Sequence, residues 1–275
     1  MEAPSASIPV GERVTVFPSA EELGRRLAVE IVDLVEAAGR DGRTFVLGCP
    51  GGRSPVSTYE AMGREFGRRG SDLSHLVIAM MDDYALPDGE GWTQPAADLH
   101  FSCRRFAHED IQAVFNAAVT PDRRVSDDRV WGPDPSDPGA YDGRLRAAGG
   151  VDVFILASGA GDGHVAFNPP GTSLDSTTRV VTLAEQTRRD NLATFPDFDG
   201  LDDVPTHGIT VGVGTIAQVS RRAVMIVVGP DKRAAVERLL DGEGYDPSWP
   251  ATVYRVIPGA RLYVDQSAAG DLTRP

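Results

Sequence analysis

The feature that most constrains this fold is a series of short, unbroken apolar runs separated by amphipathic stretches. The strongest runs cover residues 44–47, 76–81, 151–157 and 223–228. Because these runs lack polar alternation, they predict strands that are buried on both faces of a sheet. Between them, apolar residues recur at helical spacing, as at Leu23, Leu27 and Ile31. This alternation predicts an α/β, Rossmann-like fold with a mostly parallel central sheet and helices on both faces.

Capping residues predict where individual helices begin. Ser19, followed by two acidic residues, predicts the start of one helix. Ser54 as a cap, with Pro55 at the first helical position, predicts the start of another. A last helix is predicted at residues 233–240. The segments with loop-like or weak strand patterns are residues 84–100, 120–140 and 211–215.

Composition limits the classes of function. With 275 residues, 41% of them hydrophobic, the chain is expected to form one domain over residues 1–275, with 1–12 as a loose tail. The formal net charge of −13 argues against nucleic acid as the main partner and favours a small-molecule role. No apolar run could span a membrane, and no secretory pattern is seen. Only Cys49 and Cys103 are present, which favours a cytoplasmic location over a disulfide framework.

Loops that follow parallel strands meet at one edge of the sheet, where ligands bind. The loop Gly51-Gly52-Arg53-Ser54 lies between a predicted strand and a predicted helix, so its backbone N–H groups, hydroxyl and guanidinium can bind a phosphate. The alternative is a plain turn with a good helix cap. Lys232 follows the last apolar run and adds a cation at the same edge. On its own, it would be an exposed lysine in the first turn of a helix.

Acidic and imidazole side chains follow two other runs. Asp82 and Asp83 come directly after the second run, and because adjacent residues point in different directions, at most one faces a substrate. A partly desolvated carboxylate there can act as a base; the alternative is a turn or capping role. Asp162 and His164 lie in a glycine-rich turn after the third run. A carboxylate beside a histidine orients the ring for proton transfer, whereas the alternative is an Asx-turn with a surface histidine.

The sequence predicts no cofactor and no metal. Gly212, Gly214 and Ala217 match a dinucleotide-binding spacing, but the preceding strand is short and the following helix could have only about two turns. The five histidines lack metal-binding spacing, and no nucleophile-elbow motif is present.

A pattern of five segments extends over nearly the whole chain, from about residue 20 to 268. In chain order they are Gly52-Arg53-Ser54-Pro55, Met81-Asp82-Asp83-Tyr84, residues 159–173 (GAGDGHVAFNPPGTS), 211–215 (VGVGT) and 228–232. Together they resemble the glucosamine-6-phosphate deaminase and 6-phosphogluconolactonase superfamily. The phrase DGHVAFN, followed by PGTS and VGVGT, resembles the deaminase branch more closely. The resemblance implies an α/β fold of the sugar-phosphate isomerase type and a phosphosugar as the small-molecule partner.

The resemblance also implies roles for individual residues. Asp82 matches the family's base for the proton at C2, and Asp162 and His164 match the pair that opens the sugar ring. Ser54 and Lys232 match phosphate contacts. The other predicted substrate-binding residues are Gly51, Gly52, Arg53, Asp83 and Gly161.

Three positions depart from the deaminase pattern. Pro169 stands where the deaminases have a glutamate that completes the proton relay, and proline has no ionisable group. By spacing, Ala193 stands at a phosphate-binding arginine, which Arg53 could replace. Val181 stands at an effector-site lysine, so the family's allosteric control is in doubt.

These departures leave three functions open. The first is an enzyme that acts on glucosamine 6-phosphate or N-acetylglucosamine 6-phosphate by ring opening and C2 deprotonation, ending in deamination–isomerisation or in dehydration. The second is a lactonase of the 6-phosphogluconolactonase type, with His164 as the base for a water. The third is a sugar-phosphate sensor without catalysis. A homo-oligomer is compatible with each of them.

Overall fold

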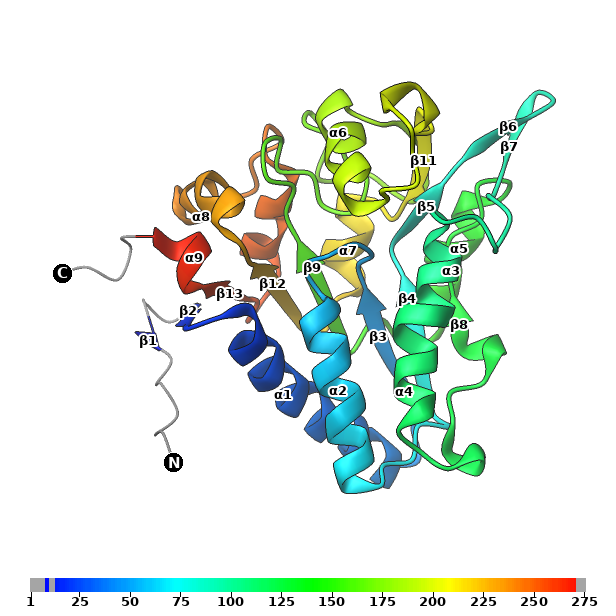
Figure 1. The fold of residues 1–275 in the computed structure, drawn as a ribbon, viewed down its shortest axis with the longest axis vertical. Coiled ribbons are helices and arrows are strands. Elements are labelled where there is room, and N and C mark those ends of the chain that lie inside the picture. Colours follow the sequence, from blue (N-terminus) through cyan, green and yellow to red (C-terminus); the bar gives the residue numbers. More distant parts are fainter. Residues whose placement is uncertain (1–7, 10–12, 271–275) are drawn as a thin grey trace.

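The computed structural model describes residues 8–9 and 13–270, and its central element is an eight-stranded sheet. In spatial order the strands are β1 (Ile8–Pro9), β2 (Val14–Phe17), β13 (Arg261–Asp265), β12 (Ala223–Val227), β9 (Val153–Ala157), β3 (Phe45–Cys49), β4 (Leu76–Met80) and β8 (Val130–Trp131). All neighbours are parallel except β1, which runs antiparallel to β2 (Figure 1). The predicted α/β class with a mostly parallel sheet is therefore confirmed.

Helices cover both faces of this sheet. The first face packs in one apolar cluster with α1 (Ala20–Arg40), α2 (Val56–Arg69), and a continuous helical segment made of α3 (Cys103–Phe106), the π-helix η1 (Ala107–Gln112) and α4 (Ala113–Ala117). The second face packs with α5 (Pro138–Ala147), α7 (Val213–Val219), α8 (Arg233–Leu240), the 3-10 helix η6 (Pro250–Val256) and α9 (Gln266–Ala269). Side chains of each strand alternate between the two clusters, so the unbroken apolar runs fill both.

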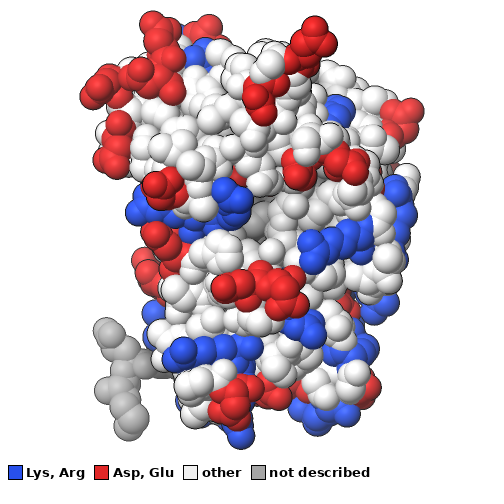
Figure 2. Space-filling model, turned by 90° about the vertical axis from the view of Figure 1, so that its right-hand side faces the viewer, with Lys and Arg blue, Asp and Glu red and all other residues white. Residues whose placement is uncertain are grey.

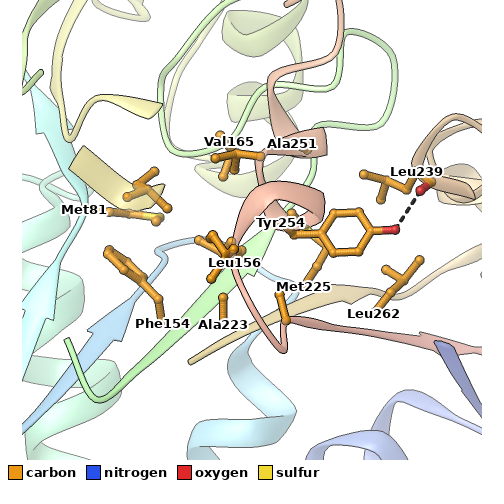
Figure 3. Packing of buried hydrophobic residues seen from close by; sticks show 14 of the residues in the cluster. Met81, Phe154, Leu156, Val165, Ala223, Met225, Leu239, Ala251, Tyr254 and Leu262 are labelled. Carbon is orange, nitrogen blue, oxygen red and sulfur yellow. Dashed lines mark hydrogen bonds between the residues drawn. The ribbon is translucent and has the colours of Figure 1, made fainter. Parts of the chain in front are cut away.

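The second cluster is shown in Figure 3. Leu156 of β9 lies there beside Met225 of β12, with the ring of Tyr254 next to them, and Phe154 lies on the other side of Leu156. The buried Tyr254 hydroxyl donates a hydrogen bond to the carbonyl of Leu239 at 2.7 Å, so this polar group inside the core has a partner.

A smaller sheet and one helix lie beyond the carboxyl ends of the central strands. The sheet is antiparallel and has the order β10 (Arg179–Thr182), β11 (His207–Thr210) and β5 (Asp82–Tyr84). Strand β5 follows β4 with only Met81 between them, and α6 (Glu185–Thr194) lies nearby at the same end of the molecule (Figure 1). Tyr84, Phe167, Leu183 and Val204 form a third apolar cluster there.

Several predicted boundaries agree with the structure. The Ser19 hydroxyl accepts a 3.3 Å hydrogen bond from the backbone N–H of Glu22 and caps α1. Helix α8 covers the predicted residues 233–240. The tail predicted at residues 1–12 lies mostly outside the described residues; within it, Ile8–Pro9 forms β1. The remaining short elements are β6 (Leu86–Asp88), β7 (Gly91–Thr93), and the 3-10 turns η2 (Pro121–Arg123), η3 (Asp127–Arg129), η4 (Leu201–Asp203) and η5 (Pro230–Lys232).

Four local predictions are wrong. Helix α2 is capped at Pro55 without a side-chain hydrogen bond, so Ser54 is not its cap. The predicted loop 84–100 contains the hairpin β6–β7, and the excursion 120–140 supplies the edge strand β8. Residues 211–215 are not a strand, because α7 begins at Val213.

The VGVGT segment has a packing role. A Cβ atom on Gly212 would lie 2.2 Å from the carbonyl oxygen of Ser176, and one on Gly214 would lie 2.6 Å from that of Leu174. The glycines that mimic a dinucleotide-binding spacing thus allow two backbone segments to approach closely.

Basic and acidic side chains are interspersed over the face shown in Figure 2. Among the described residues, no helix has the length and apolar character needed to cross a membrane.

Candidate active site

A cavity of about 370 Å³ opens at the carboxyl ends of the central strands. The loops after β3, β4, β9 and β12 all contribute to it, as the sequence predicts. Of the predicted site residues, it brings together Gly51, Gly52, Arg53, Ser54, Asp82, His164 and Lys232. Asp162 lies directly behind His164.

Asp162 fixes the orientation of the His164 ring. One carboxylate oxygen of Asp162 lies 2.7 Å from Nδ1 of His164 and also accepts the His164 backbone N–H at 3.2 Å. Burial acts to raise the pKa of Asp162, but its bonds to His164 and Thr187 outweigh burial and lower that pKa to about 2. Asp162 therefore stays ionised and holds a proton on Nδ1, which leaves Nε2 of His164 for proton transfer at the cavity.

Two glycines explain the local fold of this turn. A Cβ atom on Gly159 would lie 2.3 Å from Nδ1 of His164 and 2.4 Å from an oxygen of Asp162. Gly163 has a φ of +66°, and a Cβ atom there would lie 2.2 Å from the Trp249 ring. The glycine-rich sequence is thus required for the backbone to bring the acid and the imidazole together.

Thr187 of α6 is a third member of this cluster that the sequence did not reveal. Its buried hydroxyl lies 3.0 Å from the second carboxylate oxygen of Asp162 and 3.1 Å from Nδ1 of His164. The residue lies 23 positions after the histidine in a polar helix, so no local motif marks it. Since a threonine hydroxyl can donate to the carboxylate, Thr187 helps to hold the pair in place.

Asp82 and Asp83 point to different surroundings, as their adjacency predicts. Asp83 does not line the cavity; its carboxylate accepts backbone N–H groups of Tyr84, Cys103 and Arg104 at 2.8–3.2 Å and so caps α3. Asp82 lines the cavity and is only 7% exposed. Burial, together with the charge of Asp83, raises the pKa of Asp82 to about 7. A carboxyl group with this pKa is suited to proton abstraction near neutral pH.

Other residues that line the cavity carry groups suited to an anion. The Ser54 hydroxyl makes no hydrogen bond with any described residue, and Gly52 has a φ of +82° that turns the loop before α2. The Lys232 ammonium donates to the carbonyl of Ser158 at 2.7 Å. Burial lowers the pKa of Lys232, and the negative charge of Asp190 offsets part of this shift. Arg53 is exposed at the rim. Hydroxyl, ammonium and guanidinium groups of this kind are able to donate hydrogen bonds to an anion.

The three positions that depart from the deaminase pattern do not line the cavity. Pro169 does not line the cavity, and its carbonyl accepts the Thr172 hydroxyl at 2.7 Å. Ala193 is exposed on α6, and Val181 lies in β10. Gly161 likewise does not line the cavity. The residues with described positions contain no cluster of ligands for a metal ion.

Comparison with known proteins extends these observations. Residues 18–261 match the family described as glucosamine-6-phosphate isomerases/6-phosphogluconolactonase. A glucosamine-6-phosphate deaminase of Corynebacterium kroppenstedtii is 36% identical over 246 residues, which is 89% of this chain and 88% of that protein. One of Bifidobacterium longum is 35% identical over 267 residues, or 94% and 92% of the two chains.

Solved structures give the same result. A monomeric glucosamine-6-phosphate deaminase has a TM-score of 0.80 at 26% identity, covering 94% of this chain and 98% of that one. The 6-phosphogluconolactonase of Trypanosoma brucei has a TM-score of 0.68 at 20% identity, covering 98% and 100%, and shows the same fold. The predicted resemblance, including its closer match to the deaminases, is confirmed. The chain thus belongs to the glucosamine-6-phosphate isomerase/6-phosphogluconolactonase family.

Proposed function

We propose that this protein is an enzyme that deaminates and isomerises glucosamine 6-phosphate. The observation that carries the proposal is a single cavity with a carboxyl of raised pKa, Asp82, an oriented imidazole, His164, and an anion-binding end at Ser54 and Lys232. Its curated relatives are glucosamine-6-phosphate deaminases, which supports the same substrate class.

The geometry suits ring opening as the first step. With the phosphate anchored at Ser54 and Lys232, Nε2 of His164 can give a proton to the ring oxygen, while Asp162 and Thr187 stabilise the ring orientation. Nε2 takes this proton from the C1 hydroxyl, which becomes the carbonyl, so His164 begins and ends the step in the same protonation state. The open-chain aldehyde then presents its C2 proton to a base.

Asp82 is the proposed base for the second step. It takes the proton from C2, and the electron pair of that C–H bond forms a C1–C2 double bond. The carbonyl oxygen takes a proton from water and becomes a hydroxyl. Return of a proton to C1 leaves an imine at C2. Addition of water to this imine releases ammonia and gives a 2-keto sugar phosphate, so atoms and electrons balance.

A second outcome is dehydration. It is favoured by Pro169, which stands where the deaminases have a glutamate of the proton relay and which has no acidic group. Here the pair from the C2–H bond forms a C2–C3 double bond, and the 3-hydroxyl leaves as water after it takes a proton. An N-acetylated amine suits this route because an amide nitrogen is a poor leaving group. Both outcomes share the deprotonation by Asp82.

Product analysis distinguishes these reactions. The enzyme is incubated in D2O with glucosamine 6-phosphate, with its N-acetyl form and with 6-phosphogluconolactone. Ammonia and deuterium-labelled ketose phosphate are expected from the first sugar. An unsaturated, ultraviolet-absorbing product from the second would favour dehydration. Rapid lactone hydrolysis without C2 exchange would replace the proposal with a lactonase, and binding without any turnover would indicate a sensor.

A further inference from the structure

Helix α6 presents three polar side chains to one side, and only one of them has a complete set of partners. Thr187, Asp190 and Asn191 are separated by three and four positions, which places them on the same helical face. Thr187 contacts Asp162 and His164, so this face is directed toward the catalytic pair. Asp190 and Asn191 follow one turn later and line the same cavity. Neither residue has a role in the proton transfers described above.

Both residues have a buried polar atom without a partner. Oδ2 of Asp190 and Nδ2 of Asn191 are buried, yet no described residue bonds to them. The other oxygen of Asp190 accepts the Gln186 side-chain N–H at 2.9 Å, which holds the carboxylate in place. A buried polar atom without a hydrogen-bond partner destabilises the folded state, so such atoms are rare in proteins. Two such atoms on adjacent residues that line one cavity indicate that a ligand supplies their partners.

The chemistry of the two atoms selects the ligand group. An ionised carboxylate only accepts hydrogen bonds, and an amide N–H only donates them. A phosphate would suit Asn191 but would be repelled by Asp190, whereas an ammonium would suit Asp190 but cannot accept from Asn191. A hydroxyl does both at once.

The position of Asp190 limits which hydroxyl this is. Its charge acts on the pKa of Lys232, so it lies toward the anion-binding end of the cavity. Asp82, the proposed base at C2, also lines the cavity. In the cyclic form of a hexose 6-phosphate, whose C5 oxygen belongs to the ring, the hydroxyls between C2 and the phosphate are those at C3 and C4. We propose that Asp190 and Asn191 select the sugar by binding one of these hydroxyls; this inference rests on the proposed function.

The test compares epimers. We expect the natural protein to favour glucosamine 6-phosphate over its C3 or C4 epimer by roughly 10²-fold or more in kcat/KM, because a site built for a hydroxyl rejects one in the wrong place. In Asp190→Ala and Asn191→Ala, this ratio should fall below about tenfold. The double variant should lose little more than either single one, since both bind the same group.

Arg189→Ala is the matched control, because Arg189 is exposed on the same helix and, among the described residues, pairs with Glu185 alone. The inference would be overturned if the ratio of kcat/KM between glucosamine 6-phosphate and its epimer were the same in the natural protein, Asp190→Ala and Asn191→Ala. It would also be overturned by a uniform gain in affinity for every sugar phosphate in Asp190→Ala, which would mean that Asp190 only repels the anion. Calorimetric binding of the same epimers keeps the test independent of turnover. If no sugar is turned over but the variants still lose epimer-selective binding, only the proposed function fails.

Discussion

At the scale of single residues, Asp82 is the group on which the proposed chemistry depends. The Asp82→Asn variant keeps the size of the side chain but cannot take a proton from C2. We expect deuterium exchange at C2 to be lost by at least ~10³-fold, while sugar-phosphate affinity changes less than about threefold. Exchange is followed by NMR, and affinity by calorimetry. Retained exchange in the variant would assign the base to another group.

Thr187 is expected to act through His164 rather than on the substrate. Removal of its hydroxyl in Thr187→Val should reduce kcat by roughly tenfold and shift the pH profile, because the Asp162–His164 pair loses one hydrogen bond. For comparison, His164→Gln removes the proton-transferring group itself and should reduce kcat by at least ~10²-fold. Thr187→Ser should restore both kcat and the profile. A valine variant with the natural pH profile would reduce Thr187 to a packing role.

At the scale of elements, the loop before α2 is part of the proposed anion site. Arg53 lies at the cavity rim, so Arg53→Ala should raise KM for the phosphosugar by roughly tenfold with little change in kcat, since a charge-assisted hydrogen bond to phosphate is lost. Steady-state kinetics of Arg64→Ala provide the control, because Arg64 is an exposed arginine on α2, the helix that follows this loop. An unchanged KM in the Arg53 variant would place its side chain in solvent during the reaction.

The strands were predictable because their signal is local. Each apolar run fills both faces of a central strand, so composition alone identifies β3, β4, β9 and β12. Short edge strands such as β8 have no such signal, because only two residues pair and both are half-buried. The alternating valines and glycines of 211–215 indicate a strand, but α7 begins at Val213. The glycines allow close packing against residues 174–177, a contact that the local sequence does not reveal.

The site residues that follow central strands were predictable for the same reason, and those on α6 were not. Asp82, Asp162, His164 and Lys232 follow strands, so strand order alone brings them to one edge. Thr187, Asp190 and Asn191 belong to a helix that reaches the cavity only through the fold of the smaller sheet. Ser54 shows the reverse case: the sequence placed it near the cavity but assigned it a capping bond that the structure does not contain.

At the scale of the whole molecule, the buried Asp82 couples the chemistry to stability. Its pKa in the folded protein is about 7, whereas an unfolded aspartate has a pKa near 3.8. Between these values the folded state binds more protons than the unfolded state, so the free energy of unfolding falls as pH rises. A carboxyl shifted upward in this way is most favourable at low pH, and its ionisation penalises the fold near neutrality.

This coupling gives a prediction for the entire chain. Asp82→Asn has no charge to bury, so we expect it to be more stable than the natural protein by about 4 kcal/mol at pH 8, with the difference falling toward zero near pH 4. Urea unfolding at several pH values measures this difference. Asp88→Asn, at an exposed position in β6, removes one charge from the net −13 without removing a buried one and should show no such trend. A pH-independent difference for Asp82→Asn would mean that Asp82 is not the group titrating in this window. If the Asp82→Asn variant gains stability and also loses C2 exchange, the same buried carboxylate both lowers the free energy of unfolding and provides the catalytic base.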